Sequence, residues 1–344
     1  MDIRHLLEQY EGGQRDFTGL DLRNIDLSRQ TLLGLGLVGT NLTGANLSRA
    51  FLTQSDLSET FLNWADLSYV KLSEGRLVDA DLTKAVLVGA FLVKSDLSKA
   101  KLSGADLNGA NLRGACLHRA NLCGTNLQGA NLRNADLSGA NLSWANLNGA
   151  RLSGANLTGA FLTGVNLEKA FLNGLDLKGV DLTGVNLSQA KLNGADLSQA
   201  NLTLSNLSEA QLQGASMTQA NLMGADLSGA HLSHAELSWS DLSRANLDRA
   251  DLSHAHLLGI KLDEARFQAV ILSEAARKYF SLLSSESQSS RQDAPATPMD
   301  SPPPAPRQDD WGAIAPSYAP PSYRSTPAPQ LGSLSASSDR PLWY

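Results

Sequence analysis

Leucine recurs at every fifth position over about three quarters of this chain. From Phe17 to Leu272 there are 52 such positions, and all hold leucine except Phe17, Met217 and Phe267. The position two residues before each leucine usually holds a small side chain, most often alanine. The five-residue register never slips, so no inserted loop interrupts the array.

Neither regular secondary structure can place all of these leucines in one interior. An α-helix rotates every fifth residue by about 140°, and a flat strand sends every fifth residue to alternate faces. The leucines share an interior only if the chain turns a corner in each repeat. Asparagine, aspartate, serine, threonine and glycine fill the remaining positions, and these residues favour turns. The sequence therefore predicts a coil with the leucine and the small residue inside.

The residue before each leucine indicates how many repeats make one coil. Asparagine or aspartate occupies 30 of the 52 positions. With three repeats to a coil, the columns hold 10 of 18, 11 of 17 and 9 of 17, which is an even distribution. With four repeats, the columns of 13 hold 11, 9, 7 and 3. Because stacked coils sort their side chains into columns, the pattern favours a four-sided coil of 20 residues.

The run ANLRGACLHRANLCGTNLQGANLRNADLSGANLSWANLNGA, residues 110–150, resembles the A(D/N)Lxx signature of the pentapeptide-repeat family. The resemblance covers about three quarters of the chain. It implies an all-β fold, a right-handed four-sided parallel β-helix (a solenoid), in agreement with the column pattern. At four repeats to a coil, the array makes about 13 coils.

Segments outside the array predict a short helical cap at both ends. Residues 1–15 include the amphipathic stretch DIRHLLEQY before Gly12–Gly13, and we expect an N-terminal capping helix on the β-helix over 16–272. Ser273 is placed to N-cap a C-terminal capping helix over 273–284. That helix would place Phe280 and Leu283 against the last coil. If both ends are covered, a monomer is favoured, whereas an open last coil would allow a dimer through that end.

Residues 285–344 differ in composition from the array. All 12 prolines of the chain lie in this segment, and it is also rich in serine. Such a segment cannot bury a core, so we expect a disordered tail. Its aromatic residues are either solvated or form a partner-docking motif; they are Trp311, Tyr318, Tyr323, Trp343 and Tyr344.

The sequence predicts a cytoplasmic protein without enzyme activity. It shows no signal peptide and no apolar run long enough to span a membrane. Its two cysteines, Cys116 and Cys123, are expected to be outward, unpaired thiols in a reducing compartment. There is no Gly-rich phosphate loop, no Ser–His–Asp set and no CxxC motif, and a regular rod offers no pocket. We therefore expect no catalytic residue, no cofactor and no metal, and interpret the many aspartates as turn residues.

Two surface features carry alternative interpretations. His234, His254 and Glu274 are spaced by 20 residues, so they should stack in one column where zinc could bind, although chance exposure of histidines is favoured. Further candidates for this site are His231, Asp251, Glu236 and His256. Aromatic residues before or near the repeat leucines either form an apolar patch that binds a partner or stack along the wall of the rod. They are Phe51, Phe61, Trp64, Phe91, Phe161 and Phe171.

Surface charge separates the candidate functions. We name each face after the first residue of its column: in residues 15–274 the Asp21, Asp26, Thr31 and Asp16 faces carry net charges of −1, −2, +3 and −4. Some pentapeptide-repeat proteins mimic DNA and protect DNA gyrase from quinolones, which requires a continuous anionic stripe that is absent here. We favour a structural or protein-interaction scaffold with an unidentified protein partner and no nucleic acid. The alternatives are a gyrase-binding DNA mimic and a metal-linked or transport-regulating accessory protein.

Overall fold

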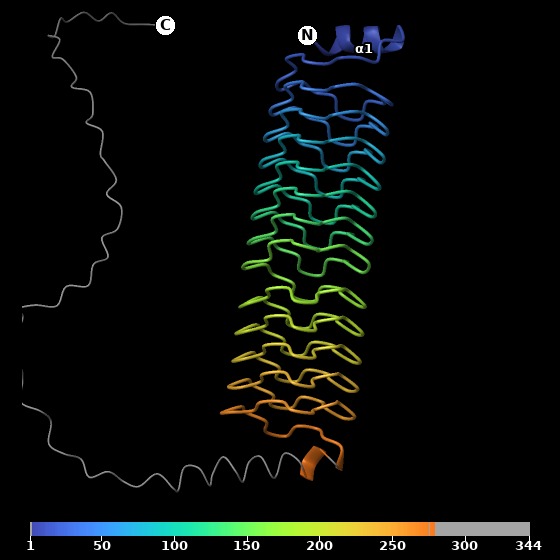
Figure 1. The fold of residues 1–344 in the computed structure, drawn as a ribbon. Coiled ribbons are helices and arrows are strands. Elements are labelled where there is room, and N and C mark those ends of the chain that lie inside the picture. Colours follow the sequence, from blue (N-terminus) through green and yellow to red (C-terminus); the bar gives the residue numbers. More distant parts are fainter. Residues whose placement is uncertain (1, 275, 279–344) are drawn as a thin grey trace, which may run out of the picture. The chain divides into compact units, whose positions relative to one another are not determined.

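The computed structural model describes residues 2–274 and 276–278, which lie in the first of two compact units, Met1–Asp293. A short helix, α1 (Ile3–Glu11), precedes a stack of coils (Figure 1). In the described residues the coils pair through single-residue parallel bridges, such as Asp26 with Asn46 and Asp251 with Ile271. Each bridge joins residues 20 positions apart. This register agrees with the four repeats per coil that the column pattern predicts.

Each repeat turns through a residue in the left-handed backbone region. The value of φ is +63° at Gly109 and +61° at Gln199, so both glycine and larger residues take this position. Where Asp or Asn precedes the leucine, its side chain accepts a hydrogen bond from the amide that follows the leucine, as Ser198 donates to Asp196 Oδ1 at 2.9 Å. This local hydrogen bond closes the turn and explains the preference for Asn and Asp at that position.

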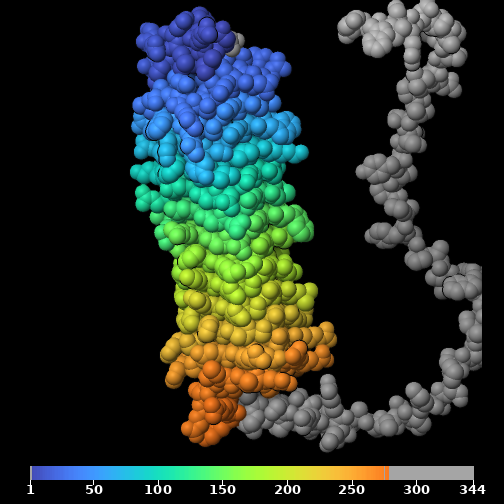
Figure 2. All heavy atoms as spheres, turned by 180° about the vertical axis from the view of Figure 1, so that it is seen from behind, coloured from blue at the N-terminus to red at the C-terminus, as the bar shows by residue number. Residues whose placement is uncertain are grey.

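The interior is a continuous core of leucine and alanine. Leu112 and Ala110 are fully buried, and the same holds for nearly all of their counterparts. Each buried leucine contributes about 1.5–3 kcal/mol to folding. Where serine or threonine replaces the interior alanine, its hydroxyl finds a main-chain acceptor, as Thr125 Oγ1 donates to the Leu102 carbonyl at 2.9 Å. The stack presents a closely packed surface from behind (Figure 2).

Helical residues follow the array at one end and precede it at the other. The Asp2 side chain accepts a hydrogen bond from the His5 amide at 2.9 Å, and Leu6 of α1 is fully buried. At the other end, residues 274 and 276–278 are helical, and Ser273 Oγ accepts from the Ala276 amide at 3.3 Å. Ala276 packs against the core. The predicted contacts of Phe280 and Leu283 and the predicted tail over 285–344, with its aromatic residues, lie outside the described residues.

The main-chain ladder between coils is interrupted at one place in the described residues, which we call the ladder gap. From Phe17 to Leu252, the amide at each leucine position donates to the carbonyl 19 residues ahead, except at Leu157 and Leu162. The bridges Asn156–Asp176 and Phe161–Asp181 are also missing from the otherwise regular series. The ladder gap comprises eight amides without their inter-coil acceptor: Gly154, Leu157, Gly159, Leu162, Gly164, Asp176, Asp181 and Asn186. Successive turns are visibly further apart there (Figure 1).

The ladder gap coincides with bulky interior side chains. Leu175, Val180 and Val185 occupy three successive interior positions that hold alanine in most coils, and the missing hydrogen bonds lie on one side of these three. The fourth interior position of this coil is Ala170, and there the stacking on the same side is intact, with the Phe171 amide donating to the Ala150 carbonyl at 2.8 Å. Added methyl groups overpack an interior that alanine fills, so opening one side of the coil relieves them.

Candidate interaction surfaces

The predicted histidine column forms, but it gathers no metal site. The rings of His234 and His254 stack with centroids 5.0 Å apart and planes within 12° of parallel. No cluster of three or more His, Cys, Asp or Glu side chains in residues 2–274 and 276–278 is arranged to hold a metal ion. Nearby, His256 Nε2 lies 3.7 Å from Glu236 Oε1. The two histidine rings therefore stack on each other, but the Glu274 side chain does not join them as a third metal ligand.

The two cysteines are free and half-buried. Cys116 lies in the Asp16 column, where its sulfur is 3.1 Å from Ser98 Oγ, and Cys123 lies after Asn121 on the Asp21 face. Different faces therefore carry the two thiols.

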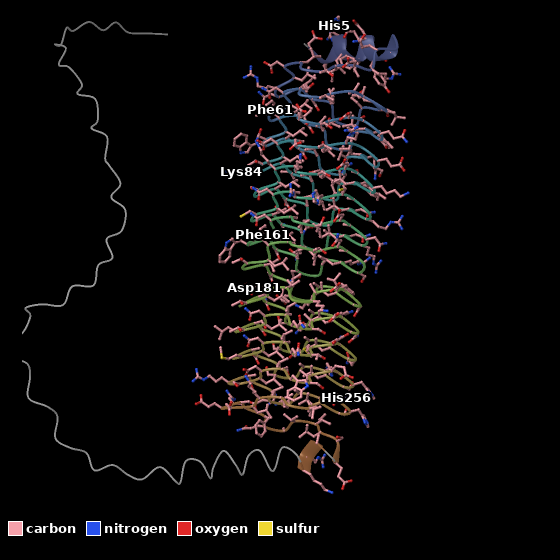
Figure 3. All side chains as sticks on the ribbon, in the orientation of Figure 1. His5, Phe61, Lys84, Phe161, Asp181 and His256 are labelled. Atoms are coloured by element: carbon pink, nitrogen blue, oxygen red, sulfur yellow. The ribbon has the colours of Figure 1, made fainter. Side chains whose placement is uncertain are left out.

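Apolar side chains concentrate on the Asp21 face, and this distribution goes beyond the phenylalanines that the sequence singled out. Figure 3 shows Phe61 and Phe161 projecting from one edge of the rod, together with Lys84 and Asp181 of the same face. Trp144 is 68% exposed, and its ring lies over Gly164 of the next coil. The exposed apolar residues of this face are Phe61, Trp64, Trp144, Phe161, Leu204 and Met223. We call this set the apolar strip.

The remaining phenylalanines lie on the Thr31 face, where Phe91 and Phe171 stand beside cations and Phe51 is exposed. Lys71 Nζ is 2.9 Å from the centroid of the Phe91 ring, and burial lowers the pKa of Lys71. Phe171 lies between two cations: its centroid is 4.3 Å from Lys191 Nζ and 5.9 Å from Arg151 Cζ. Such contacts are electrostatically favourable because the ring face is negative. The rings of Phe91 and Phe171 therefore stack along the wall, which is the second of the two interpretations.

A groove of about 620 Å³ follows the junction of the Asp26 and Thr31 faces, and we call it the basic groove. One wall is a column of turn residues, and the other is the column that holds Phe171. The lining residues are Asn148, Gly149, Lys169, Phe171, Gln189, Lys191, Glu209, Gln211 and His231. Sequence inspection missed this groove, although the 20-residue spacing of Arg151, Phe171 and Lys191 is a signal that could have indicated it.

Unpaired positive charge characterises the basic groove. Lys169 Nζ is neutralised by Glu168 Oε1 at 2.7 Å, and Glu209 accepts a hydrogen bond from Gln189 at 2.8 Å. Within the part of the chain that the structure describes, Lys191 and Arg151 take part in none of the ion pairs. The groove thus offers one cation without an ion-pair partner, Lys191, beside the Phe171 ring, and Arg151 lies on the other side of that ring outside the groove lining.

The aspartates are engaged in turns. Hydrogen bonding from the Ser138 side chain lowers the pKa of Asp136, and hydrogen bonding from Ser198 lowers that of Asp196 in the same way. Burial acts to raise the pKa of Asp251, but hydrogen bonds from Ser253 and the nearby histidines outweigh it, so this pKa is also lowered. These carboxyl groups stay ionised and hold the backbone, which is a structural role.

None of the described helices is long and apolar enough to cross a membrane.

Comparison with known proteins matches the array to one family. The sequence profile described as "Pentapeptide repeats" covers residues 16–74 and 76–276 in overlapping segments. The search of curated proteins found no match.

Solved structures of pentapeptide-repeat proteins are similar to this chain. HetL, involved in heterocyst differentiation regulation in the cyanobacterium Nostoc sp. strain PCC 7120, is 31% identical, with 80% of this chain and 98% of HetL covered and a TM-score of 0.27. A thylakoid-lumen protein of Arabidopsis thaliana is 33% identical, with 32% of this chain and 76% of that protein covered and a TM-score of 0.31. The plasmid-mediated fluoroquinolone resistance protein QnrB1 is 18% identical, with coverage of 78% and 98% and a TM-score of 0.17.

The profile match covers well over half of the chain, and its residues coincide with the stacked coils that the structure shows. The chain therefore belongs to the pentapeptide-repeat family.

Proposed function

We propose that this protein is a non-enzymatic scaffold that binds an acidic segment of a protein partner in the basic groove. The observation that carries the proposal is the stack of Arg151, Phe171 and Lys191, in which two cations without ion-pair partners flank a ring beside a groove. Acidic side chains would pair with the cations, and an apolar side chain would contact the ring. The rigid coil spacing fixes the main-chain positions of these groups in a line, so binding requires no ordering of the scaffold's main chain.

The absence of enzyme activity is part of the proposal. The carboxyl groups of Asp136 and Asp196 have lowered pKa values and hold turns. A general acid or base instead works best with a pKa near the operating pH. Two free thiols at Cys116 and Cys123 support a cytoplasmic setting, since an oxidising compartment would expose both to disulfide exchange.

The test uses charge reversal in the basic groove and a matched reversal elsewhere. Lys191→Glu removes the groove cation that has no ion-pair partner, whereas Lys101→Glu changes the same charge on the Asp21 face. A fluorescein-labelled decapeptide of alternating glutamate and phenylalanine serves as the probe, with fluorescence anisotropy as the readout. We expect Lys191→Glu to weaken binding about tenfold, or about 1.4 kcal/mol, and Lys101→Glu to leave it unchanged. Salt should weaken the wild-type interaction.

Equal binding by the wild type and Lys191→Glu would refute the groove as the site. If Lys191→Glu weakens binding, the partner is sought by pull-down with the full chain as bait and Lys191→Glu as the negative control. A chain that ends at residue 284 separates the contribution of the C-terminal segment.

A further inference from the structure

The ladder gap exposes main-chain groups that the rest of the array pairs. Leu157 and Leu162 on one rim have free amides, and Asp176 and Asp181 on the other rim have both a free amide and a free carbonyl. Paired main-chain groups are the norm in folded proteins, so a contiguous run of unpaired groups resembles the edge of a sheet. Such an edge accepts an added strand, whose main chain supplies the missing donors and acceptors.

The interior is also reachable at this place. Ala160 and Val180 are half-buried, whereas Ala140 and Ala200, one coil away on either side, are fully buried. Both missing bridges lie on the Asp16 and Asp21 faces, whereas on the Thr31 and Asp26 faces the ladder gap ends with the single amides of Gly154 and Asn186. On the Asp26 face, Asn186 Nδ2 donates to Asn166 Oδ1 at 3.1 Å across it. An apolar side chain of a partner can therefore reach the interior through the opening on the Asp16 and Asp21 faces.

The apolar strip passes the mouth of the ladder gap on the Asp21 face. Phe161 stands on one rim and is 62% exposed, with Trp144 one coil before it. Leu204 and Met223 follow beyond the other rim and are exposed as well. Phe161 and Asp181 lie along the same edge of the rod (Figure 3). Because apolar side chains stand on both sides of the unpaired main-chain groups, contact with a partner is favoured over contact with water at this position.

The charges around the ladder gap determine which kind of partner segment it attracts. The Asp16 face is the most acidic of the four, and close to the ladder gap it carries Asp136, Asp176 and Asp196 against Lys178. Asp181 adds a carboxylate on the opposite rim from Phe161. A basic side chain is therefore attracted to this opening, and an acidic one is repelled. This preference is the reverse of that of the basic groove, so the two surfaces are independent.

From these observations we infer that the ladder gap is a docking site for an extended, basic segment of a partner protein. The main chain of the segment pairs with the free groups of Leu157, Leu162, Asp176 and Asp181. Alternate side chains of an extended segment point in opposite directions. One set, which is apolar, contacts Ala160 and Val180, and the other set, which is basic, meets the aspartates on the rims.

The probe is a fluorescein-labelled peptide of roughly eight residues that alternates leucine and lysine, which matches the two-residue side-chain period of a strand. A second peptide of the same sequence carries N-methyl groups on alternate amides and cannot form the main-chain ladder. Binding to the full chain is measured by fluorescence anisotropy. Hydrogen exchange of the Leu157, Leu162 and Asp181 amides locates the bound peptide, with the paired amides of Leu137 and Leu142 as references.

We expect the gap amides to exchange faster than the references in the free protein and to slow when the first peptide binds. The N-methylated peptide should bind at least about tenfold more weakly. The triple substitution of Leu175, Val180 and Val185 by alanine restores the usual interior residue and should close the gap and weaken binding to the same extent. Lys191→Glu, in the basic groove, should bind the peptide as the wild type does, which separates this site from the proposed function.

Equal exchange of gap and reference amides in the free protein would overturn the inference. So would failure of the first peptide to bind, equal binding of the N-methylated peptide, or slowed exchange only at another face. If the triple variant does not fold, the comparison of the two peptides on the wild-type chain still decides the question.

Discussion

Replacing Gly89 by alanine tests how turn side chains pack against the next coil. Gly89 and Gly109 occupy the same turn position in consecutive coils, with φ of +62° and +63°. A Cβ at Gly109 meets nothing within 4 Å, whereas one at Gly89 lies 2.6 Å from the ring carbon Cε1 of Tyr69. Both substitutions carry the same backbone cost. The difference between them therefore isolates the packing of Tyr69 on the glycine.

The magnitude follows from two contributions. Alanine in the left-handed region costs about 1–2 kcal/mol. Alanine also reduces the conformational freedom of the unfolded chain, which offsets about 0.4–1 kcal/mol of this cost. Gly109→Ala should therefore destabilise the protein by roughly 0.5–1 kcal/mol. Tyr69 is 47% exposed, so close to half of its surface is covered. That is roughly 100 Å², which at about 25 cal/mol per Å² gives an upper limit near 2.5 kcal/mol. Because the ring can pivot and keep part of this contact, we expect Gly89→Ala to cost about 1 kcal/mol more than Gly109→Ala.

A double-mutant cycle measures the contact directly. Urea unfolding of the wild type, Gly89→Ala, Tyr69→Ala and the double variant should give a coupling energy of about 1 kcal/mol between the two sites. Hydrogen exchange in the two coils serves as a second readout, since a solenoid can unfold in parts. Equal destabilisation by Gly89→Ala and Gly109→Ala, or a coupling energy near zero, would refute the reasoning.

Three further outcomes are expected. The pKa of Asp196 is lowered by hydrogen bonding from Ser198, so the stability it contributes is present above its ordinary pKa of 3.8 and is lost as pH falls through the lowered value. Melting curves in acid should show this loss, and Ser198→Ala should show less of it; identical losses would contradict the assignment. Ser95→Ala should change the unfolding free energy by less than about 1 kcal/mol, because the Leu72 carbonyl keeps an amide donor, and urea unfolding checks this. Zinc should leave the melting temperature unchanged, because the stacked histidines have no third ligand; a rise would show binding.

Much of the fold follows from the repeat itself. A leucine every five residues cannot share an interior on a helix or a flat strand, so a corner in each repeat is required. The sorting of Asn and Asp into columns indicated a 20-residue register, and the bridges have that register. The same columns placed His234 over His254 correctly. Contacts of this kind are predictable because the repeat converts sequence separation directly into spatial separation.

The candidate sites were less predictable because they depend on neighbouring columns. Lys191 and Phe171 of the basic groove share one column, but the second wall comes from turn residues such as Lys169 on the adjoining face. A single column does not show which turn side chains stand beside it. The apolar strip likewise combines turn residues such as Trp144 with bridge residues such as Phe161.

The sequence by itself determined the interior, the period and the columns, because a strict repeat leaves one way to bury its leucines. Only the tertiary structure decided where the ladder opens. Leu175, Val180 and Val185 mark the place, but Leu20, Ile25 and Leu35 are also bulky interior residues and their inter-coil hydrogen bonds are intact. Leu35 lies in a coil that is bridged on both sides, through Gly36 to Asp16 and to Asp56, so a neighbour on each side does not by itself open the ladder. Whether a bulky residue fits depends on contacts with neighbouring side chains that the repeat pattern does not contain.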